Sequence, residues 1–394
     1  MKTKMRFVSL LSASLLLAAC GETTTEEETT TDDTEQVETI EEETATEEPA
    51  TEESDSAEDT EEEADTEEES EGETREDNSD DQALEGSTLK YGYGAPHGTK
   101  SFSATFVGLE DDTITHAFID EFQFMGEGDW SGVPNNDGAF AEGYENDSTL
   151  ISKVENDEDY SAMMEENAGA TMTLGEGYQA ISDFAVGKTI SEVEDAISEL
   201  NGLDEDQAIS DVVSGATLVD TAGYLQAIVD VANDGYGVEA TDSISDAEFS
   251  YSLQAPHGDK SFAIVGTLTS DDTVLAAVQD EFQFLDGAEF TGVPNSDDEF
   301  GDAYADDLIL ASKVENDDGY SAMMEENADA EHTYLENMQA ILDFTQGKMV
   351  SELEEAVSEL EGQSEEDAVA DVVSGATFVD TAGYLQAIID TVQQ

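Results

Sequence analysis

The chain has 394 residues, of which 99 are acidic and 11 are basic, and its formal net charge at pH 7 is -88. A surface of this kind repels the phosphates of nucleic acids and the headgroups of anionic lipids, which argues against nucleic acid as a partner. Salt screens such self-repulsion, so the charge suits a saline or alkaline habitat. With 38% hydrophobic residues, the chain can form about two ordinary domains once its non-folding segments are set aside.

Residues 1–20 have the pattern of a secretory signal peptide. They begin with Lys2, Lys4 and Arg6 and continue with an apolar run that is too short to remain as a membrane-spanning helix. The final letters, LAAC, resemble the lipobox of bacterial lipoproteins, in which the cysteine is lipidated and becomes the first residue of the mature chain. The resemblance implies a lipid anchor at Cys20, the single cysteine of the sequence. An ordinary signal peptide with an incidental cysteine is the alternative.

Residues 21–87 consist mainly of Glu, Asp and Thr. Like charges repel one another and there is little apolar surface to bury, so we expect a disordered acidic tether. A flexible chain of this length spans on the order of 45 Å, and more when it is self-repelled. The tether would hold the folded part away from a membrane.

The rest of the sequence repeats itself. APHGTKSF begins at Ala95 and APHGDKSF at Ala255, and the blocks DEFQF, GVPN, SKVEND and DVVSGAT recur with the same offset of 160 residues. A period this long indicates tandem domains rather than a solenoid, since each copy can bury a core of its own. We therefore predict one domain over 88–236, a linker over 237–247 and a second copy over 248–394.

Within each copy the residue pattern changes from strands to helices. Segments 101–109 and 112–124 alternate apolar and polar residues, which indicates antiparallel strands. Segment 189–200 has apolar residues on one helical face and begins with Thr189 and Glu192 in capping-box register. Strands followed by helices predict an α+β fold in two tandem copies.

The block DVVSGAT has a structural interpretation of its own. Thr217 and Asp220 fit the S/T-x-x-D/E start of a helix, so we predict a helix from near Leu218, capped by the Thr217 hydroxyl, with Gly215 supplying the turn. A cap does not account for the aspartate and serine earlier in the block.

The pattern D-x-x-S-G-A-T resembles the flavinylation sequence of FMN-binding domains, found in the sodium-pumping quinone reductase and Rnf subunits that carry covalent flavin. In that family an ApbE-type flavin transferase takes FMN from FAD and joins its phosphate to the last Ser or Thr of the motif. The resemblance implies two covalent FMN groups, attached through Thr217 and Thr377. The other residues of the two motifs are Asp211, Ser214, Gly215, Ala216, Asp371, Ser374, Gly375 and Ala376.

The lipobox, the polar tether and the two domains together resemble the PplA-type lipoproteins of flavin-based extracellular electron transfer in Gram-positive bacteria. The resemblance implies a redox carrier on the outer face of the cell membrane, rather than an enzyme with its own substrate turnover. It would accept electrons from a membrane quinol-linked reductase and pass them to ferric iron or soluble flavins. A lipid-anchored module that binds a small ligand or cation without flavin, and a structural surface protein, are the alternatives.

His97 and His257, within the two APHG blocks, are the histidines that occupy matching positions. The neighbouring proline and glycine predict a turn with local hydrogen bonding, and a position beside the flavin is the alternative. The carboxylate-rich loops after Pro134 and Pro294 do not fit the spacing of a calcium loop, so we predict no designed metal site.

Overall fold

The computed structural model describes residues 86–394, apart from 127, 146–147, 204–207, 329 and 362–365. All of these residues belong to one compact unit, Asp77–Gln394. The predicted signal peptide, Cys20 and nearly all of the predicted tether lie outside the described residues. In the part of the chain that the structure describes, none of the helices has the length and apolar character needed to cross a bilayer.

The fold is mixed α+β and contains two antiparallel sheets. The first half of the described chain, residues 87–239, has strands first and helices after. Its last strand lies largely in the segment expected to be a linker, where it pairs with the first strand. The elements of this half are β1 (Ser87–Gly94), β2 (Ser101–Glu110), β3 (Thr113–Met125), β4 (Thr149–Ser152), α1 (Asp157–Ala168), α2 (Leu174–Ala185), α3 (Ile190–Leu200), α4 (Thr221–Asp234) and β5 (Tyr236–Glu239).

The second half, residues 248–394, again has strands before helices. Its elements are β6 (Glu248–Gln254), β7 (Ser261–Ser270), β8 (Thr273–Asp286), β9 (Leu308–Ser312), α5 (Asp317–Ala328), α6 (Tyr334–Thr345), α7 (Val350–Leu360), α8 (Glu366–Val372) and α9 (Thr381–Val392). Short 3-10 turns are η1 (Ala139–Gly143), η2 (Ile209–Asp211) and η3 (Gly301–Ala303).

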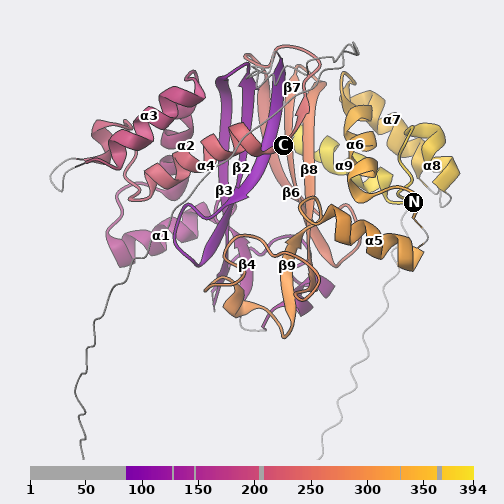
Figure 1. The fold of residues 1–394 in the computed structure, drawn as a ribbon, viewed down its shortest axis with the longest axis horizontal. Helices are drawn as coiled ribbons and strands as arrows, with labels where there is room; N and C mark the ends of the chain where they lie inside the picture. The colour runs from indigo at the N-terminus through magenta and orange to yellow at the C-terminus, as the bar shows by residue number, and fades with distance from the viewer. Residues whose placement is uncertain (1–85, 127, 146–147, 204–207, 329, 362–365) are drawn as a thin grey trace, which may run out of the picture. The chain divides into compact units, whose positions relative to one another are not determined.

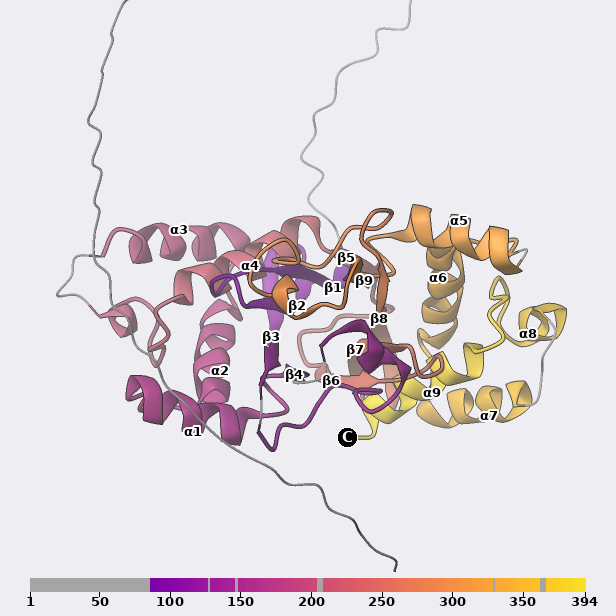
Figure 2. The same ribbon diagram turned by 90° about the horizontal axis from the view of Figure 1, so that it is seen from below.

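The two sheets lie between two groups of helices. The strand orders are β4-β3-β2-β1-β5 and β6-β7-β8-β9, and the paired strands run antiparallel. Figures 1 and 2 show α1 to α4 beside the first sheet and α5 to α9 beside the second. Each sheet therefore has one face toward its own helices and the other toward the opposite half.

This layering explains why the central strands are buried on both faces. Every residue of β2 from Ser101 to Leu109 is buried, although the alternating sequence suggested a strand with one polar face. Phe102 belongs to a core that also contains second-half residues, and its ring centroid lies 5.7 Å from that of Phe282. Val107 belongs to a second core beneath the helices. The first half therefore buries a core of its own beneath its helices, and in addition the aromatic faces of the two sheets cover each other in a core that both halves share.

The repeated GVPN block holds the two halves together. Asn135 and Asn295 adopt left-handed backbone angles, with φ of 64° and 67°, a conformation that asparagine tolerates better than most residues. The Asn135 Nδ2 donates to the carbonyl of Ser261 at 2.7 Å, and the Asn295 Nδ2 donates to that of Ser101 at 2.7 Å. Each half thus inserts an asparagine into the loop before a central strand of the other.

The predicted capping box at Thr189 is confirmed. α3 begins at the next residue, the Thr189 hydroxyl accepts from the backbone N–H of Glu192 at 3.3 Å, and the Glu192 carboxylate accepts from the N–H of Thr189 at 3.0 Å. Local hydrogen bonding of this kind depends on residues three positions apart, so the sequence is sufficient to predict it.

Candidate functional site

The S-G-A-T block forms a turn before α4 rather than the first turn of that helix. Gly215 has a φ of 89°, which favours glycine, and Ala216 is buried. α4 begins only at Thr221, whose N–H and hydroxyl both donate to the carbonyl of Leu218, at 3.1 and 2.6 Å. The prediction that Thr217 caps a helix from Leu218 was therefore wrong, because Leu218 lies in the turn that Thr221 closes, and Thr221 is the first residue of the helix.

The Thr217 side chain is left exposed by this arrangement. Its hydroxyl contacts the Met172 Sδ at 3.7 Å, and thioether sulfur is a weak acceptor. The helix dipole acts mainly within the first turn, and α4 begins four residues after Thr217, so the helix would give a phosphate on Thr217 little direct support. The Thr217 hydroxyl is nonetheless accessible to a modifying enzyme.

The APHG loop packs against the start of α4 because a glycine allows the contact. A Cβ atom on Gly223 would lie 2.6 Å from the carbonyl oxygen of Pro96, which is too close for any side chain. His97 then reaches Asp220, with Nδ1 and Oδ2 2.7 Å apart. This hydrogen bond of His97 is not local in the sequence, because it uses the carboxylate at the N-cap position of α4, which makes no side-chain cap.

The second half repeats this loop contact. A Cβ atom on Gly383 would lie 2.3 Å from the carbonyl oxygen of Pro256, and the His257 Nδ1 lies 2.8 Å from the Asp380 Oδ2. Both predicted histidines therefore anchor a loop to the helix that follows a S-G-A-T turn.

A cavity of about 500 Å³ opens beside Thr217. This volume lies within the range of roughly 300–1,000 Å³ that is typical of small-molecule sites. Helices α1 and α2 and the loop between them provide apolar walls, the sheet side provides buried polar groups, and the chain before α4 forms the rim. The lining residues that matter most are Met164, Leu174 and Leu218 on the walls, Glu121, Lys153 and Tyr224 at the polar end, and His97, Thr217 and Asp220 on the rim.

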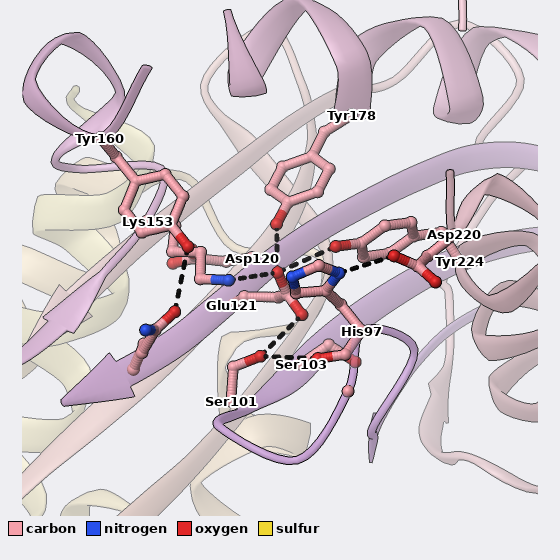
Figure 3. Close-up of polar contacts among 12 residues, drawn as sticks. His97, Ser101, Ser103, Asp120, Glu121, Lys153, Tyr160, Tyr178, Asp220 and Tyr224 are labelled. Carbon is pink, nitrogen blue, oxygen red and sulfur yellow. Dashed lines mark hydrogen bonds and ion pairs between the residues drawn. The ribbon is translucent and has the colours of Figure 1, made fainter. Parts of the chain in front are cut away.

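The polar end of the cavity is the Glu121 carboxylate, both of whose oxygens accept hydrogen bonds. The Glu121 Oε2 accepts from the Lys153 Nζ at 2.8 Å, the Tyr178 hydroxyl at 2.6 Å and the Tyr224 hydroxyl at 2.9 Å. The Glu121 Oε1 accepts from the Ser101 hydroxyl at 3.2 Å. Figure 3 shows these donors converging from the sheet, α2 and α4.

This ion pair is almost completely removed from water. The Lys153 and Glu121 side chains are each 1% exposed. Burial is the largest single influence and acts to lower the pKa of Lys153, but the Glu121 charge, Tyr160 and the hydrogen bonds to both together raise that pKa above its ordinary value, so the ammonium form is retained. Sequence reasoning noted DEFQF and SKVEND only as repeats. A glutamate inside an apolar strand and a lysine in an acidic chain were the signals available.

The second half contains the same ion pair with a smaller set of hydroxyl donors. The Glu281 Oε2 accepts from the Lys313 Nζ and the Tyr384 hydroxyl, at 2.8 and 2.6 Å, and the Oε1 accepts from the Ser261 hydroxyl at 2.8 Å. Met338 occupies the position that corresponds to Tyr178, so it offers no hydroxyl to the carboxylate.

The surroundings of Thr377 differ from those of Thr217. The Asn337 Oδ1 accepts from the Thr377 N–H at 2.6 Å and from its hydroxyl at 3.1 Å. Tyr334 is 1% exposed, and its ring centroid lies 5.8 Å from that of Phe378. Thr377 is half-buried, whereas Thr217 is exposed.

The structure does not bring the remaining motif residues to the cavity lining. Asp211 is exposed in η2, where its carboxylate accepts from the Ala208 N–H at 3.2 Å. Ser214 lines a separate surface hollow beside α2, and Ser374 and Gly375 line a similar one beside α6. Gly375, with a φ of 93°, and buried Ala376 repeat the first turn, and Asp371 is exposed near the end of α8.

Two further buried acids join the halves and were not predicted. The Asp120 carboxylate accepts from the Tyr251 hydroxyl at 3.0 Å, and the Asp280 carboxylate accepts from the Tyr93 hydroxyl at 2.6 Å. Burial raises the pKa of both aspartates to about 6. Burial and the charge of Asp120 raise the pKa of Glu155 to about 7.

Within the described ranges, no group of three or more histidine, cysteine, aspartate or glutamate side chains is arranged to hold a metal ion. Comparisons with protein-family models, with curated proteins and with solved structures returned no match to this chain.

Proposed function

We propose that the protein is an extracellular electron carrier that holds two covalent FMN groups, through Thr217 and Thr377. The observation that carries the proposal is the exposed hydroxyl of Thr217 on the rim of an apolar-walled cavity of about 500 Å³. A flat apolar ring attached to Thr217 could lie in this cavity, and the exposed hydroxyl is accessible to a transferase.

The residues around the cavity fit such a group. Met164, Leu174 and Leu218 offer apolar contact area to an aromatic ring. Glu121 and Lys153 neutralise each other, so the polar end presents hydroxyl and ammonium groups without an uncompensated charge. His97 lies on the rim with Thr217.

Attachment needs an ApbE-type flavin transferase and FAD. The bond between the two phosphates of FAD breaks and AMP leaves, while the threonine Oγ–H bond is replaced by an Oγ–P bond and the proton passes to the transferase. When bound, FMN supplies one- and two-electron redox chemistry through its ring, which the phosphoester leaves unmodified. A covalent bond also prevents loss of the cofactor by dilution outside the cell.

In this proposal the two halves are tandem copies of one FMN-binding domain, supported by the 160-residue offset of their sequence blocks. The Cys20 lipid anchors them to the outer face of the cell membrane through the acidic tether. A membrane quinol-linked reductase supplies the electrons, and ferric iron or soluble flavins accept them. The negative charge of the chain attracts cationic acceptors.

The proposal is tested by expressing the full chain with a flavin transferase. We expect flavin fluorescence on a denaturing gel and an intact mass with two added FMN groups. Thr217→Ala should remove one group, Thr377→Ala the other, and the double variant both. Thr171→Ala, which removes another exposed hydroxyl from the same cavity, is the matched control and should retain both. If the chain isolated from its native host carried no covalent flavin, the proposed function as an electron carrier would be refuted.

The cavity itself is equally compatible with a lipid-anchored module that binds a small ligand without flavin. That alternative predicts a full-length chain that is never flavinylated in its native host and that retains ligand binding when both threonines are replaced by alanine.

A further inference from the structure

We propose that the two sites are not equivalent: the first half encloses its flavin ring in the cavity beside Thr217, and the second half leaves its ring outside, because its own side chains fill the corresponding space. This inference rests on the proposed function and specifies how the two attachment sites differ. The difference between the two sites arises at three pairs of matching positions, Leu174/Tyr334, Gly177/Asn337 and Leu218/Phe378.

Two of the three larger side chains, Tyr334 and Phe378, replace cavity wall with packed aromatic rings. Leu174 and Leu218 line the cavity of the first half. At the matching positions, the Tyr334 ring lies 5.5 Å from that of Tyr320, and the Phe378 ring lies 5.9 Å from that of Tyr384, centroid to centroid. Rings at these separations are in direct contact, so they form core where the first half has walls.

The Tyr334 hydroxyl supports this interpretation. It is buried and has no hydrogen-bond partner among the described residues. An unpaired buried hydroxyl is destabilising, so the tyrosine is not held there by a polar contact. The Tyr334 ring is retained as apolar filling, supported by the Phe378 ring and by the Lys313 ammonium, which lies 5.7 Å from the Tyr334 ring centroid.

Asn337 fixes the attachment residue itself. Its Oδ1 accepts from the Thr377 N–H, from the Thr377 hydroxyl and from the Phe378 N–H, the last at 3.2 Å. The matching residue Gly177 has no side chain to make such bonds, and a Cβ there would lie 3.0 Å from the Leu218 Cδ1. A glycine at this position therefore lets Leu218 pack against α2 while the Thr217 hydroxyl remains free of an amide.

The consequence is a division of roles. A ring on Thr217 would be sheltered from solvent by α1, α2 and the rim, whereas a ring on Thr377 would contact solvent and external electron acceptors. The ring nearer the solvent would be the one that delivers electrons outside.

Single-site chains measure this difference directly. Full-length chain bearing flavin only on Thr217 (Thr377→Ala) is compared with chain bearing it only on Thr377 (Thr217→Ala), using iodide quenching of flavin fluorescence at constant ionic strength and visible circular dichroism. We expect a several-fold lower quenching constant and a stronger dichroic band for the flavin on Thr217. Equal quenching and equal dichroism would overturn the inference and leave the proposed function intact.

Lumiflavin, a flavin ring without phosphate, tests the cavity without any covalent step. We expect the unmodified full chain to bind one equivalent, and Leu218→Phe to abolish binding. Tyr334→Leu combined with Phe378→Leu should create a second site, and Tyr334→Phe, which keeps the ring, should not. If the double variant does not fold, loss of lumiflavin binding in Leu218→Phe still tests whether an aromatic ring at this position closes the cavity.

The outcomes of the two proposals are distinguishable. Binding of one lumiflavin by a chain that is never flavinylated refutes the proposed function and supports the difference between the halves. Two equivalents, or none, in the unmodified chain overturn the difference between the halves whether or not covalent flavin is found.

Discussion

The two halves of the molecule share a scaffold and differ in what lies beside the S-G-A-T turn. Both have a buried glutamate–lysine pair and a histidine–aspartate contact at the start of the following helix. In the first half the adjacent space is a cavity, and in the second half it contains Tyr334 and Phe378. Identical motifs therefore do not guarantee identical sites, because the walls come from residues outside the motif.

The difference also extends to the buried carboxylates. Tyr178 donates to Glu121, whereas Met338 at the matching position makes no such contact with Glu281. The first half supports its carboxylate with one more hydroxyl, so the two halves should respond differently when the buried lysine is removed.

Removing the buried lysine should destabilise both halves, and the second half more. Lys153→Met and Lys313→Met each leave a buried carboxylate without its counter-ion, which costs about 3–5 kcal/mol. We expect the larger loss for Lys313→Met because Glu281 retains fewer hydroxyl donors. Urea unfolding of the full chain measures both. Lys100→Met, at a side chain that is 66% exposed, is the control and should change little. An equal or smaller loss for Lys313→Met would contradict the extra support by Tyr178.

The buried aspartates should give the two halves the same pH dependence. Burial raises the pKa of Asp120 and Asp280 from 3.8 to about 6, so the folded state binds protons more tightly than the unfolded state. Their contribution is fully present below about pH 4 and is lost as the pH rises through about 6, by about 3 kcal/mol for each residue.

Asp120→Asn and Asp280→Asn should therefore each flatten the stability profile between about pH 4 and pH 7 by this amount. Chemical unfolding across that range measures the effect, and Asp259→Asn, at an exposed position, serves as control. If only one of the two substitutions flattened the profile, the two carboxyl–tyrosine contacts would not be equivalent.

Replacing Asn337 by alanine should lower the stability of the chain more than replacing Gly177 by alanine does. Asn337→Ala leaves the Thr377 N–H without its acceptor and should cost about 1–3 kcal/mol. Gly177→Ala introduces a Cβ that meets only the flexible end of Leu218, and alanine favours a helix over glycine by up to about 1 kcal/mol, so a small change is expected. Thermal unfolding measures the stability of both variants. If Asn337→Ala caused no loss of stability, the conclusion that Asn337 restrains Thr377 would be contradicted.

The smallest effect is expected for the two histidines. The His97 and His257 side chains are 49% and 46% exposed, and exposed contacts between such side chains contribute about 1 kcal/mol or less. His97→Ala and His257→Ala should therefore lower stability equally and slightly. In flavinylated chain, His97→Ala should also change the visible dichroism of the Thr217 flavin, because His97 lines that cavity. A large loss of stability in either variant would assign the histidine a structural role that its exposure does not suggest.

The sequence was sufficient for features that depend on neighbouring residues. Alternation predicted β2 and β3, and the spacing of Thr189 and Glu192 predicted the start of α3. It failed at Thr217, which was predicted to cap a helix from near Leu218, whereas Leu218 lies in a turn and α4 begins at Thr221. Periodicity likewise could not show that both faces of β2 are buried, because the covering surface belongs to a segment far along the chain.

The sequence by itself determined the α+β order of elements, the 160-residue offset of the repeated blocks and the position of each S-G-A-T turn. Only the tertiary structure decided that the halves share an aromatic core, that Glu121 and Lys153 meet beside Thr217, and that a cavity lies there while the rings of Tyr334 and Phe378 pack together in the other half. Turns and caps are set by contacts over a few residues. A cavity is set by side chains that lie tens of residues apart in the sequence, and its volume changes when one leucine becomes an aromatic ring.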